Sequence, residues 1–287
     1  TNISDTPIGS SRSYMIVQND TLCIVWLEVP PGIDYDPPGT PPMYRISHDA
    51  GATFSETAEL EGSDDKKYCD SSDWYGAPSN AHKQLNETRG LQYDIIGGGS
   101  DIVFLQTSIH DNFGNGLSSS ARRLAYSEMV KDILMIAEGS NVYVFWSDIP
   151  WGWTERQLFF ASSSDLGEHV KTTKLRSSLN GNAIWPTGLH MVARNNTVLL
   201  LWSDPHGINT RFETDYDWKI LMVRSTDGGK SLTGLVDLMP DSHEVFDPQL
   251  AFSNDNLYLI WQEYDVNNQS DIFFAKSIDF GLTFTKG

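Results

Sequence analysis

The feature that most constrains the fold is an internal repeat marked by four tryptophans. Each tryptophan ends a short run of β-favouring residues, and a carboxylate follows it two positions later. The four pairs are Trp26 with Glu28, Trp146 with Asp148, Trp202 with Asp204, and Trp261 with Glu263. Between 18 and 25 residues after each tryptophan lies the Asp of a Ser-x-Asp-x-Gly turn. Two signals that recur in step predict a supersecondary unit repeated along the chain.

The best-preserved unit, residues 190–232, shows what is repeated. Three β-favouring runs, residues 190–193, 197–202 and 219–223, are separated by turn-forming residues. Short strands joined in this way form an antiparallel meander. A fifth, weaker unit between residues 90 and 130 has lost both the tryptophan and the turn. Because one such small sheet cannot bury both of its faces, we expect the units to pack into one all-β domain.

The turns resemble the Asp-box, or BNR repeat, of sialidase-like β-propellers. Residues 47–54 and 277–284 match Ser-x-Asp-x-Gly-x-Thr-aromatic throughout, residues 225–232 change the last two positions, and residues 163–167 keep only Ser, Asp and Gly. The resemblance implies an all-β, five-bladed (alternatively six-bladed) propeller of the sialidase-like type. It implies a single domain over residues 1–287, with an insertion at residues 63–89 and blades near residues 10–62, 90–130, 131–180, 186–240 and 245–287.

We expect the Asp and Gly of each turn to serve the fold. An Asp side chain can accept N–H bonds across a turn, and Gly allows a positive φ. The second and last units show no fourth strand in the sequence. For the last unit, either the N-terminal segment supplies this strand or the natural chain continues beyond Gly287. The expected structural positions are Asp49, Gly51, Asp165, Gly167, Asp227, Gly229, Asp279 and Gly281.

The carboxylates that follow the tryptophans are candidates for a binding site. In a propeller, the loops between second and third strands open on one face, so these carboxylates and nearby aromatic residues are expected at one mouth. Aromatic platforms with acceptors suit a glycan, and a ring of carboxylates equally suits Ca²⁺. Alternatively, the repeated carboxylates satisfy loop N–H groups and serve only the fold. The candidates are Glu28, Asp148, Trp151, Trp153, Asp204, His206, Trp218 and Glu263.

Charge and processing signals indicate the compartment. The net charge of −18 argues against attraction to nucleic acid or anionic membranes, and no apolar run approaches the ~20 residues of a membrane span. Cys23 and Cys69 allow either a disulfide in an oxidising compartment or two free thiols. Together these features favour an extracellular, cell-surface glycoprotein. Five sequons are candidates for N-glycosylation: Asn2, Asn19, Asn86, Asn195 and Asn268.

The function expected from these features is a non-enzymatic binding or structural module at a cell surface that holds a glycan, a cation or another surface protein. A separate interpretation makes the chain one segment of a longer repeat protein in a surface layer or filament. The alternative is an exo-α-sialidase-like glycoside hydrolase. Sialidases carry three arginines for the substrate carboxylate, and the spacing of this chain does not assemble such a triad. The segment Tyr44-Arg45-Ile46-Ser47 is similar to the Arg-Ile-Pro motif of that family but lacks the Pro. No Ser-His-Asp signature, phosphate loop or HExxH motif is present.

Overall fold

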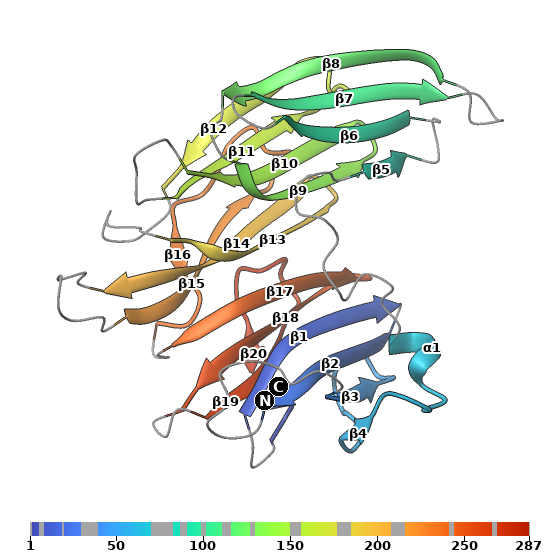
Figure 1. Ribbon diagram of the computed structural model, residues 1–287, viewed down its shortest axis with the longest axis vertical. Coiled ribbons are helices and arrows are strands. Elements are labelled where there is room, and N and C mark those ends of the chain that lie inside the picture. The colour runs from blue at the N-terminus through green and yellow to red at the C-terminus, as the bar shows by residue number, and fades with distance from the viewer. Residues whose placement is uncertain are drawn as a thin grey trace. The chain divides into compact units, whose positions relative to one another are not determined.

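The computed structural model is all-β apart from one short helix, α1 (Lys66–Cys69) (Figure 1). It describes residues 2–5, 9–18, 20–29, 40–69, 83–86, 91–98, 102–110, 116–126, 130–149, 156–176, 185–207, 216–240, 244–265 and 269–286. Within residues 83–126 it describes the backbone only. By their contacts the residues form two compact units: residues 1–75, 207–220 and 238–287, and residues 76–206 and 221–237. The single domain over residues 1–287 stays a prediction.

Five four-stranded sheets make up the described part of the chain, and strands that follow one another in sequence lie side by side. The pairs with a described register are antiparallel. The first sheet consists of β1 (Gly9–Gln18), β2 (Thr21–Val29), β3 (Pro42–Ser47) and β4 (Ala58–Glu59). The second consists of β5 (Lys83–Asn86), β6 (Leu91–Gly98), β7 (Ile102–His110) and β8 (Gly116–Tyr126).

The remaining three sheets carry the other tryptophans of the repeat. The third sheet consists of β9 (Val130–Glu138), β10 (Asn141–Asp148), β11 (Gln157–Ser163) and β12 (Lys171–Leu175). The fourth consists of β13 (Thr187–Arg194), β14 (Thr197–Gly207), β15 (Tyr216–Ser225) and β16 (Val236–Asp237). The fifth consists of β17 (Val245–Ser253), β18 (Asn256–Tyr264), β19 (Ser270–Ser277) and β20 (Thr285–Lys286). The three strands predicted over residues 190–193, 197–202 and 219–223 lie within β13, β14 and β15. The all-β fold of several antiparallel sheets is therefore confirmed.

The second sheet differs from the prediction at its first edge. The sequence indicated three strands there and no fourth. The structure has a fourth strand, β5, which pairs with β6 from within residues 63–89, the segment predicted to be an insertion. This strand carries one apolar residue, Leu85, among four, so no apolar pattern marks it in the sequence.

The sequence showed no fourth strand for the last sheet, but the structure has a short one. Thr285 and Lys286 form β20 and pair with the end of β19. Further along the same edge, Asn2 forms a bridge with Phe273, and the Ile3 N–H donates to the carbonyl of Ile272 over 2.6 Å. Both ends of the chain therefore complete the outer edge of β19 (Figure 1), which includes the N-terminal contribution offered as one alternative.

The strands that end in a tryptophan form the core of each unit. In the second unit, alternate residues of β10 face opposite clusters: Trp146 packs with Ile133 of β9, while Phe145 packs with Trp202 of β14. All three large aromatic side chains are fully buried. A strand that is buried on both faces reads as a continuous apolar run, which is why these runs stand out in the sequence. In the first unit, Trp26 and Trp261 are buried in the same manner.

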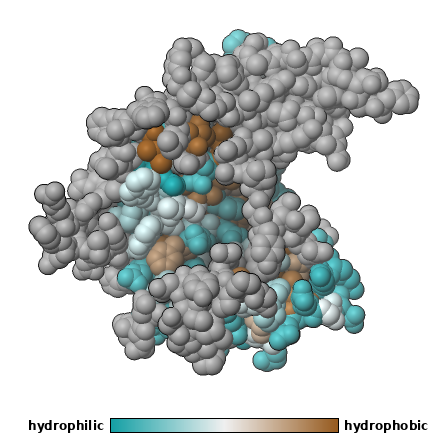
Figure 2. Space-filling view, in the orientation of Figure 1, coloured by the Kyte–Doolittle hydropathy of each residue, from teal (hydrophilic) through white to brown (hydrophobic). Residues whose placement is uncertain are grey.

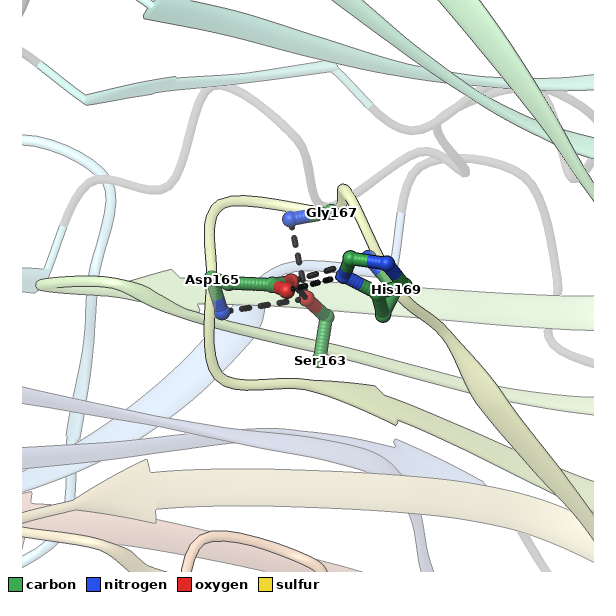
Figure 3. A network of polar contacts seen from close by, with 4 residues as sticks. All are labelled: Ser163, Asp165, Gly167 and His169. Carbon is green, nitrogen blue, oxygen red and sulfur yellow. Dashed lines mark hydrogen bonds and ion pairs between the residues drawn. The ribbon is translucent and has the colours of Figure 1, made fainter.

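The four Ser-x-Asp-x-Gly turns share one hydrogen-bond network, drawn for residues 163–169 in Figure 3. The Ser Oγ donates to Asp Oδ1 over 2.7–2.8 Å and accepts the Gly N–H over 2.8–2.9 Å. The Asp carboxylate accepts the N–H of the residue four positions on, over 2.8–2.9 Å, and contacts its side chain over 2.6 Å. That residue is Thr in two turns, Ser in one and His169 in the turn of Figure 3.

These bonds favour the charged form of each turn carboxylate. The residue four positions on contributes most, and the Ser hydroxyl adds to it. Together they lower the pKa of Asp49, Asp227 and Asp279 to about 2. The pKa of Asp165 is also lowered, with the N–H of His169 as the largest cause.

The turn glycines lie against the preceding sheet. Gly51 and Gly229 both have a φ of +80°. A Cβ atom at Gly51 would lie 2.6 Å from the ring of Phe274 on β19, and one at Gly229 would lie 2.6 Å from the Cβ of Ser162 on β11. Only glycine fits such positions, so the two turns dock onto the third strand of a neighbouring sheet in the same way.

Residues 59–69 cover one face of the first sheet. Figure 2 shows hydrophilic side chains over α1 and the neighbouring strands β3 and β4. Beneath them, Leu60 is buried, and Cys69 forms a disulfide with Cys23 of β2, with a Cα–Cα distance of 5.4 Å. Among the described residues, no helix is long and apolar enough to cross a membrane.

Candidate functional site

The four carboxylates that follow the tryptophans lie in different surroundings. Glu28 on β2 is half-buried, and both it and the buried Asp148, at the end of β10, engage other groups. Glu263 on β18 accepts the indole N–H of Trp261 over 3.0 Å. In that sheet the carboxylate serves the fold, because it satisfies a buried donor.

Asp204 is the exception. Its side chain is 1% exposed, and neither carboxylate oxygen has a hydrogen-bond partner in the described part of the chain. Burial disfavours the charged form, and it raises the pKa of Asp204 to about 7. A buried carboxyl group without a partner lowers the stability of the folded state. The repeat therefore contains one carboxyl group that its surroundings do not explain as structural.

The alternation of β14 determines where Asp204 points. Leu200 and Trp202 on this strand pack in one cluster with Phe145 of β10 and Phe160 of β11. Asp204 continues the same face of β14, so its carboxyl group points towards the β9–β12 sheet. It extends the apolar layer between the two sheets at the end where β10 and β14 finish.

A second carboxylate, Asp132, lies at that end of the β9–β12 sheet. Its φ is +40°, and it occupies an irregularity in the pairing of β9 with β10. Asp132 Oδ2 accepts from Arg156 Nη1 over 2.8 Å and from Ser147 Oγ over 3.3 Å. The side chain is 43% exposed, so the ion pair leaves a solvent-accessible carboxylate. Non-glycine residues with positive φ cost free energy and occur often at functional sites.

Arg156 joins Asp132 to an aromatic side chain. Its Nη1 also donates to the carbonyl of Pro186 over 3.3 Å, and its guanidinium lies 5.3 Å from the ring of Trp185. Trp185 is 39% exposed, and a large exposed aromatic residue is unusual in the described part of this chain. Asp132, Arg156, Trp185 and Asp204 all belong to the second unit. Contacts join the first three, and Asp204 is grouped with them because β14 finishes at the same end as β10. We call these four residues the Asp204 site.

The Asp204 site combines two carboxyl groups in opposite environments. Asp204 is buried, and its raised pKa of about 7 lets it hold a proton near neutral pH. Asp132 forms an ion pair with the guanidinium of Arg156. Such a division suits general acid and base chemistry, in which one group donates a proton and another stays ionised. The exposed Trp185 adds a flat apolar surface of the kind that binds sugar rings.

Other predicted site residues lie elsewhere or outside the described residues. In the first unit, Trp218 packs edge-on against Phe246, which packs likewise against Tyr264. Trp151 and Trp153 lie outside the described residues, and for His206 only the backbone, in β14, is described. Among the described side chains, no group of three or more His, Cys, Asp or Glu is placed to hold a metal ion, so Ca²⁺ stays a prediction.

The sequons are placed unevenly. Asn195 lies in the exposed turn between β13 and β14 with a φ of +51°. Asn2 is half-buried, and its Oδ1 accepts the Asp5 N–H over 3.0 Å. Asn86 ends β5 and so lies in a strand rather than in the loop expected for it. Asn19 and Asn268 lie outside the described residues.

Sequence reasoning missed Asp132, and it considered Arg156 only as one of several unassigned arginines. No sequence signal singles out Asp132, because it sits at the start of an ordinary apolar strand. It also missed Asp247, at the pairing irregularity of β17 in the first unit, where φ is +50°. The recurrence of an Asp at this irregularity in two sheets became visible only with the strand register.

No family model matches the chain, and no curated protein matches its sequence. Solved structures do. An α-L-arabinofuranosidase catalytic domain from Coprinopsis cinerea is 14% identical, with 93% of this chain and 90% of that one covered and a TM-score of 0.42. An endo-1,4-β-xylanase from Bacteroides thetaiotaomicron is 12% identical, with 98% of this chain and 95% of that one covered and a TM-score of 0.45. A β-fructofuranosidase from Bombyx mori is 10% identical, with 100% of this chain and 64% of that one covered and a TM-score of 0.46.

This finding corrects the expected function. The sequence favoured a non-enzymatic binding or structural module, whereas the similar solved structures are named as glycoside hydrolases. With identities of 10–14% and TM-scores below 0.5, they assign no substrate and no residue role to this chain. An activity has to be derived from its own side chains.

Proposed function

We propose that the protein is a glycoside hydrolase in which Asp204 donates the proton to the leaving group. The observation that carries this proposal is the state of Asp204: buried, without a hydrogen-bond partner among the described residues, and with a pKa raised to about 7. A carboxyl group of this kind is protonated in a useful fraction of molecules near neutral pH. It can then protonate a glycosidic oxygen as the bond to the sugar breaks.

Asp132 is the proposed partner carboxylate. Glycoside hydrolases use a second, ionised carboxylate to activate water or to stabilise the positive charge that develops on the sugar. The ion pair with Arg156 and the exposure of Asp132 to solvent both support this role. Ser147 Oγ donates a further hydrogen bond and fixes the orientation of the carboxylate. Asp132 thus acts as the charged group, and Asp204 as the acid.

The proposed substrate is a neutral glycoside. Trp185 offers an exposed ring on which a sugar can stack, and the guanidinium of Arg156 is already engaged by Asp132 and Pro186. The ion pair with Asp132 offsets the positive charge that would attract a substrate carboxylate. The net charge of −18 also disfavours an anionic sugar. These features support a neutral sugar over the sialic acid of the sialidase alternative.

For the architecture, we propose a five-bladed propeller whose four turns are Asp-boxes. Five four-stranded sheets support it. So does the docking of turns: Gly51 of the first sheet packs on Phe274 of the last, just as Gly229 packs on Ser162 within the second unit. A first sheet that docks onto the last one is what closure of a ring requires.

The proposed location is extracellular, with glycans on some of the sequons. The disulfide between Cys23 and Cys69 supports an oxidising compartment. The exposed turn position of Asn195 supports glycosylation at that sequon. Extracellular glycans would then be the natural source of substrate.

The test is hydrolysis of neutral aryl glycosides with leaving groups of different acidity. For Asp204→Asn we expect a loss of about 10²- to 10⁴-fold on substrates with a poor leaving group, because these need a general acid. We expect a much smaller loss on a dinitrophenyl glycoside, which departs without protonation. The matched control is Asp148→Asn, which changes the same repeat position in the neighbouring sheet. Absence of turnover by the folded wild type over the panel, or equal losses for both substrates, would contradict the proposal.

A further inference from the structure

A pocket lies at the opposite end of β11 from Arg156, where the turn of Figure 3 meets the turn of the neighbouring sheet. Its volume is about 270 Å³. It is bordered by residues from three elements of the second unit: the end of β11, the start of β12 and the turn after β15. The lining residues are Ser162, Ser163, Ser164, His169, Val170, Lys171, Gly228 and Lys230.

The lining is rich in donors and cations. Two lysines, a histidine and three serines contribute to it, and among the described residues that line it none is acidic. In a chain with a net charge of −18, this is a local reversal of sign. The nearest turn carboxylates, Asp165 and Asp227, are held in bonds within their own turns. We propose that this pocket binds a tetrahedral oxyanion, such as a sulfate or phosphate group.

Lys171 is already positioned for this role. Its Nζ donates to the carbonyl of Lys230 over 3.0 Å, which joins β12 to the neighbouring turn. An ammonium group has three donors, so two remain for a ligand. The docking of Gly229 onto Ser162, whose Oγ donates to the Gly229 carbonyl over 3.0 Å, keeps the two walls of the pocket together. Lys230 brings the second charge from the opposite wall.

His169 distinguishes this turn from the others. Where the other turns place a Thr or Ser, this one places an imidazole, and Nδ1 contacts Asp165 Oδ2 over 2.6 Å (Figure 3). The side chain is 92% exposed, and with Nδ1 directed at Asp165, Nε2 is the ring nitrogen that remains for a ligand. A ring N–H can donate a hydrogen bond to an anion. Lys171 and Lys230 line the same pocket as His169, and Asp165 is its ion-pair partner.

The size of the pocket limits the ligand. Pockets for drug-sized ligands measure about 300–1,000 Å³, so this one takes a small anion or the charged end of a larger molecule. Either free inorganic sulfate or phosphate, or a sulfate or phosphate ester of a sugar, presents the same group. The site is separate from the proposed catalytic residues and does not rest on their activity.

Titration calorimetry at constant ionic strength tests the proposal. Its ligands are sodium sulfate, sodium phosphate, glucose 6-sulfate, glucose 6-phosphate and glucose itself. We expect saturable binding of at least one oxyanion with one site per chain, and none of glucose. The double variant Lys171→Gln with Lys230→Gln should bind about tenfold or more weakly, because it loses two charge-assisted hydrogen bonds. Binding of the esters without the inorganic ions would identify an ester as the source of the anion.

Two variants make the test specific. Lys174→Gln removes an exposed charge from the same strand, β12, outside the pocket, and should leave binding unchanged. His169→Thr restores the residue of the other turns and should weaken binding, because it removes the ring nitrogen that remains for the ligand. Absence of saturable binding, equal binding of glucose, or equal weakening by Lys174→Gln would overturn the proposal.

Discussion

Asp204 and Asp227 belong to the same repeat, one at each end of its sheet, and their surroundings are opposite. Asp227 is surrounded by donors from its own turn, which lower its pKa to about 2. Asp204 is buried without a hydrogen-bond partner among the described residues, and burial raises its pKa to about 7. Local sequence provides every partner of Asp227, so this carboxylate can recur in each turn as a folding device. The surroundings of Asp204 depend on the neighbouring sheet, so they can differ from one repeat to the next, and a catalytic role can arise in one repeat alone.

The largest expected difference between the two lies in activity. Asp204→Asn should reduce turnover of neutral glycosides with poor leaving groups by about 10²- to 10⁴-fold, since the proton donor is lost. Its thermal stability should stay equal or rise, because no hydrogen bond is removed. Asp227→Asn should do the reverse, with full turnover and lower stability. Turnover and thermal unfolding are measured for both variants. If both variants changed turnover and stability in the same way, the prediction would be wrong.

The second expected effect concerns how the turns dock. Gly229→Ala places a Cβ 2.6 Å from Ser162, at a φ of +80°, and should destabilise the fold by about 2–5 kcal/mol. Gly62→Ala has the same φ with nothing within 4 Å, so it should cost only the backbone strain of about 1–2 kcal/mol. Denaturant unfolding measures both. Equal losses would mean that the docking contact contributes nothing.

A smaller effect is expected within the turn itself. Ser225→Ala removes the donor to Asp227 and the acceptor for the Gly229 N–H, and should cost about 1–3 kcal/mol. The neighbouring Thr226→Ala changes an exposed residue and should stay within about 0.5 kcal/mol of the wild type. Denaturant unfolding again gives both values. A Ser225→Ala variant as stable as the wild type would show that the network is dispensable.

The smallest effect is expected in the pH dependence of stability. The folded pKa of Asp204 is raised, so the folded state binds more protons than the unfolded one between about pH 4 and 7, and stability from this group falls as pH rises through that window. The folded pKa of Asp227 is lowered, so its contribution is lost as pH falls from about 4 to 2. Asp204→Asn should flatten the first window alone, and Asp227→Asn the second alone. Unfolding curves from pH 2 to 8 provide the check.

The sequence predicted the local features of the molecule well. The strands ending in Trp146, Trp202 and Trp261 are buried on both faces, and that burial creates the apolar runs by which they are recognised. The turns were predictable because their hydrogen bonds join residues no more than four positions apart in the sequence. Strand β5 was missed because its four residues carry no such pattern.

The candidate site was only partly predictable. Asp204 was among the predicted residues, but nothing in the sequence separates it from Asp148 or Glu263, because its lack of a partner depends on contacts between sheets. Asp132 and Arg156 lie 24 residues apart and meet only once β9, β10 and β11 have paired. The function expected from the repeat alone was wrong for a related reason: a repeat reports the scaffold, whereas chemistry resides in the positions that depart from it.

The most direct test of this account is the titration of the Asp204 carboxyl group itself. Aspartate labelled with ¹³C at the side-chain carboxyl would give one resonance per residue, and the resonance lost in Asp204→Asn is that of Asp204. The account predicts that this resonance titrates with a pKa near 7. A midpoint near 4, as for an ordinary exposed aspartate, would contradict it and remove the proton donor on which the proposed activity rests.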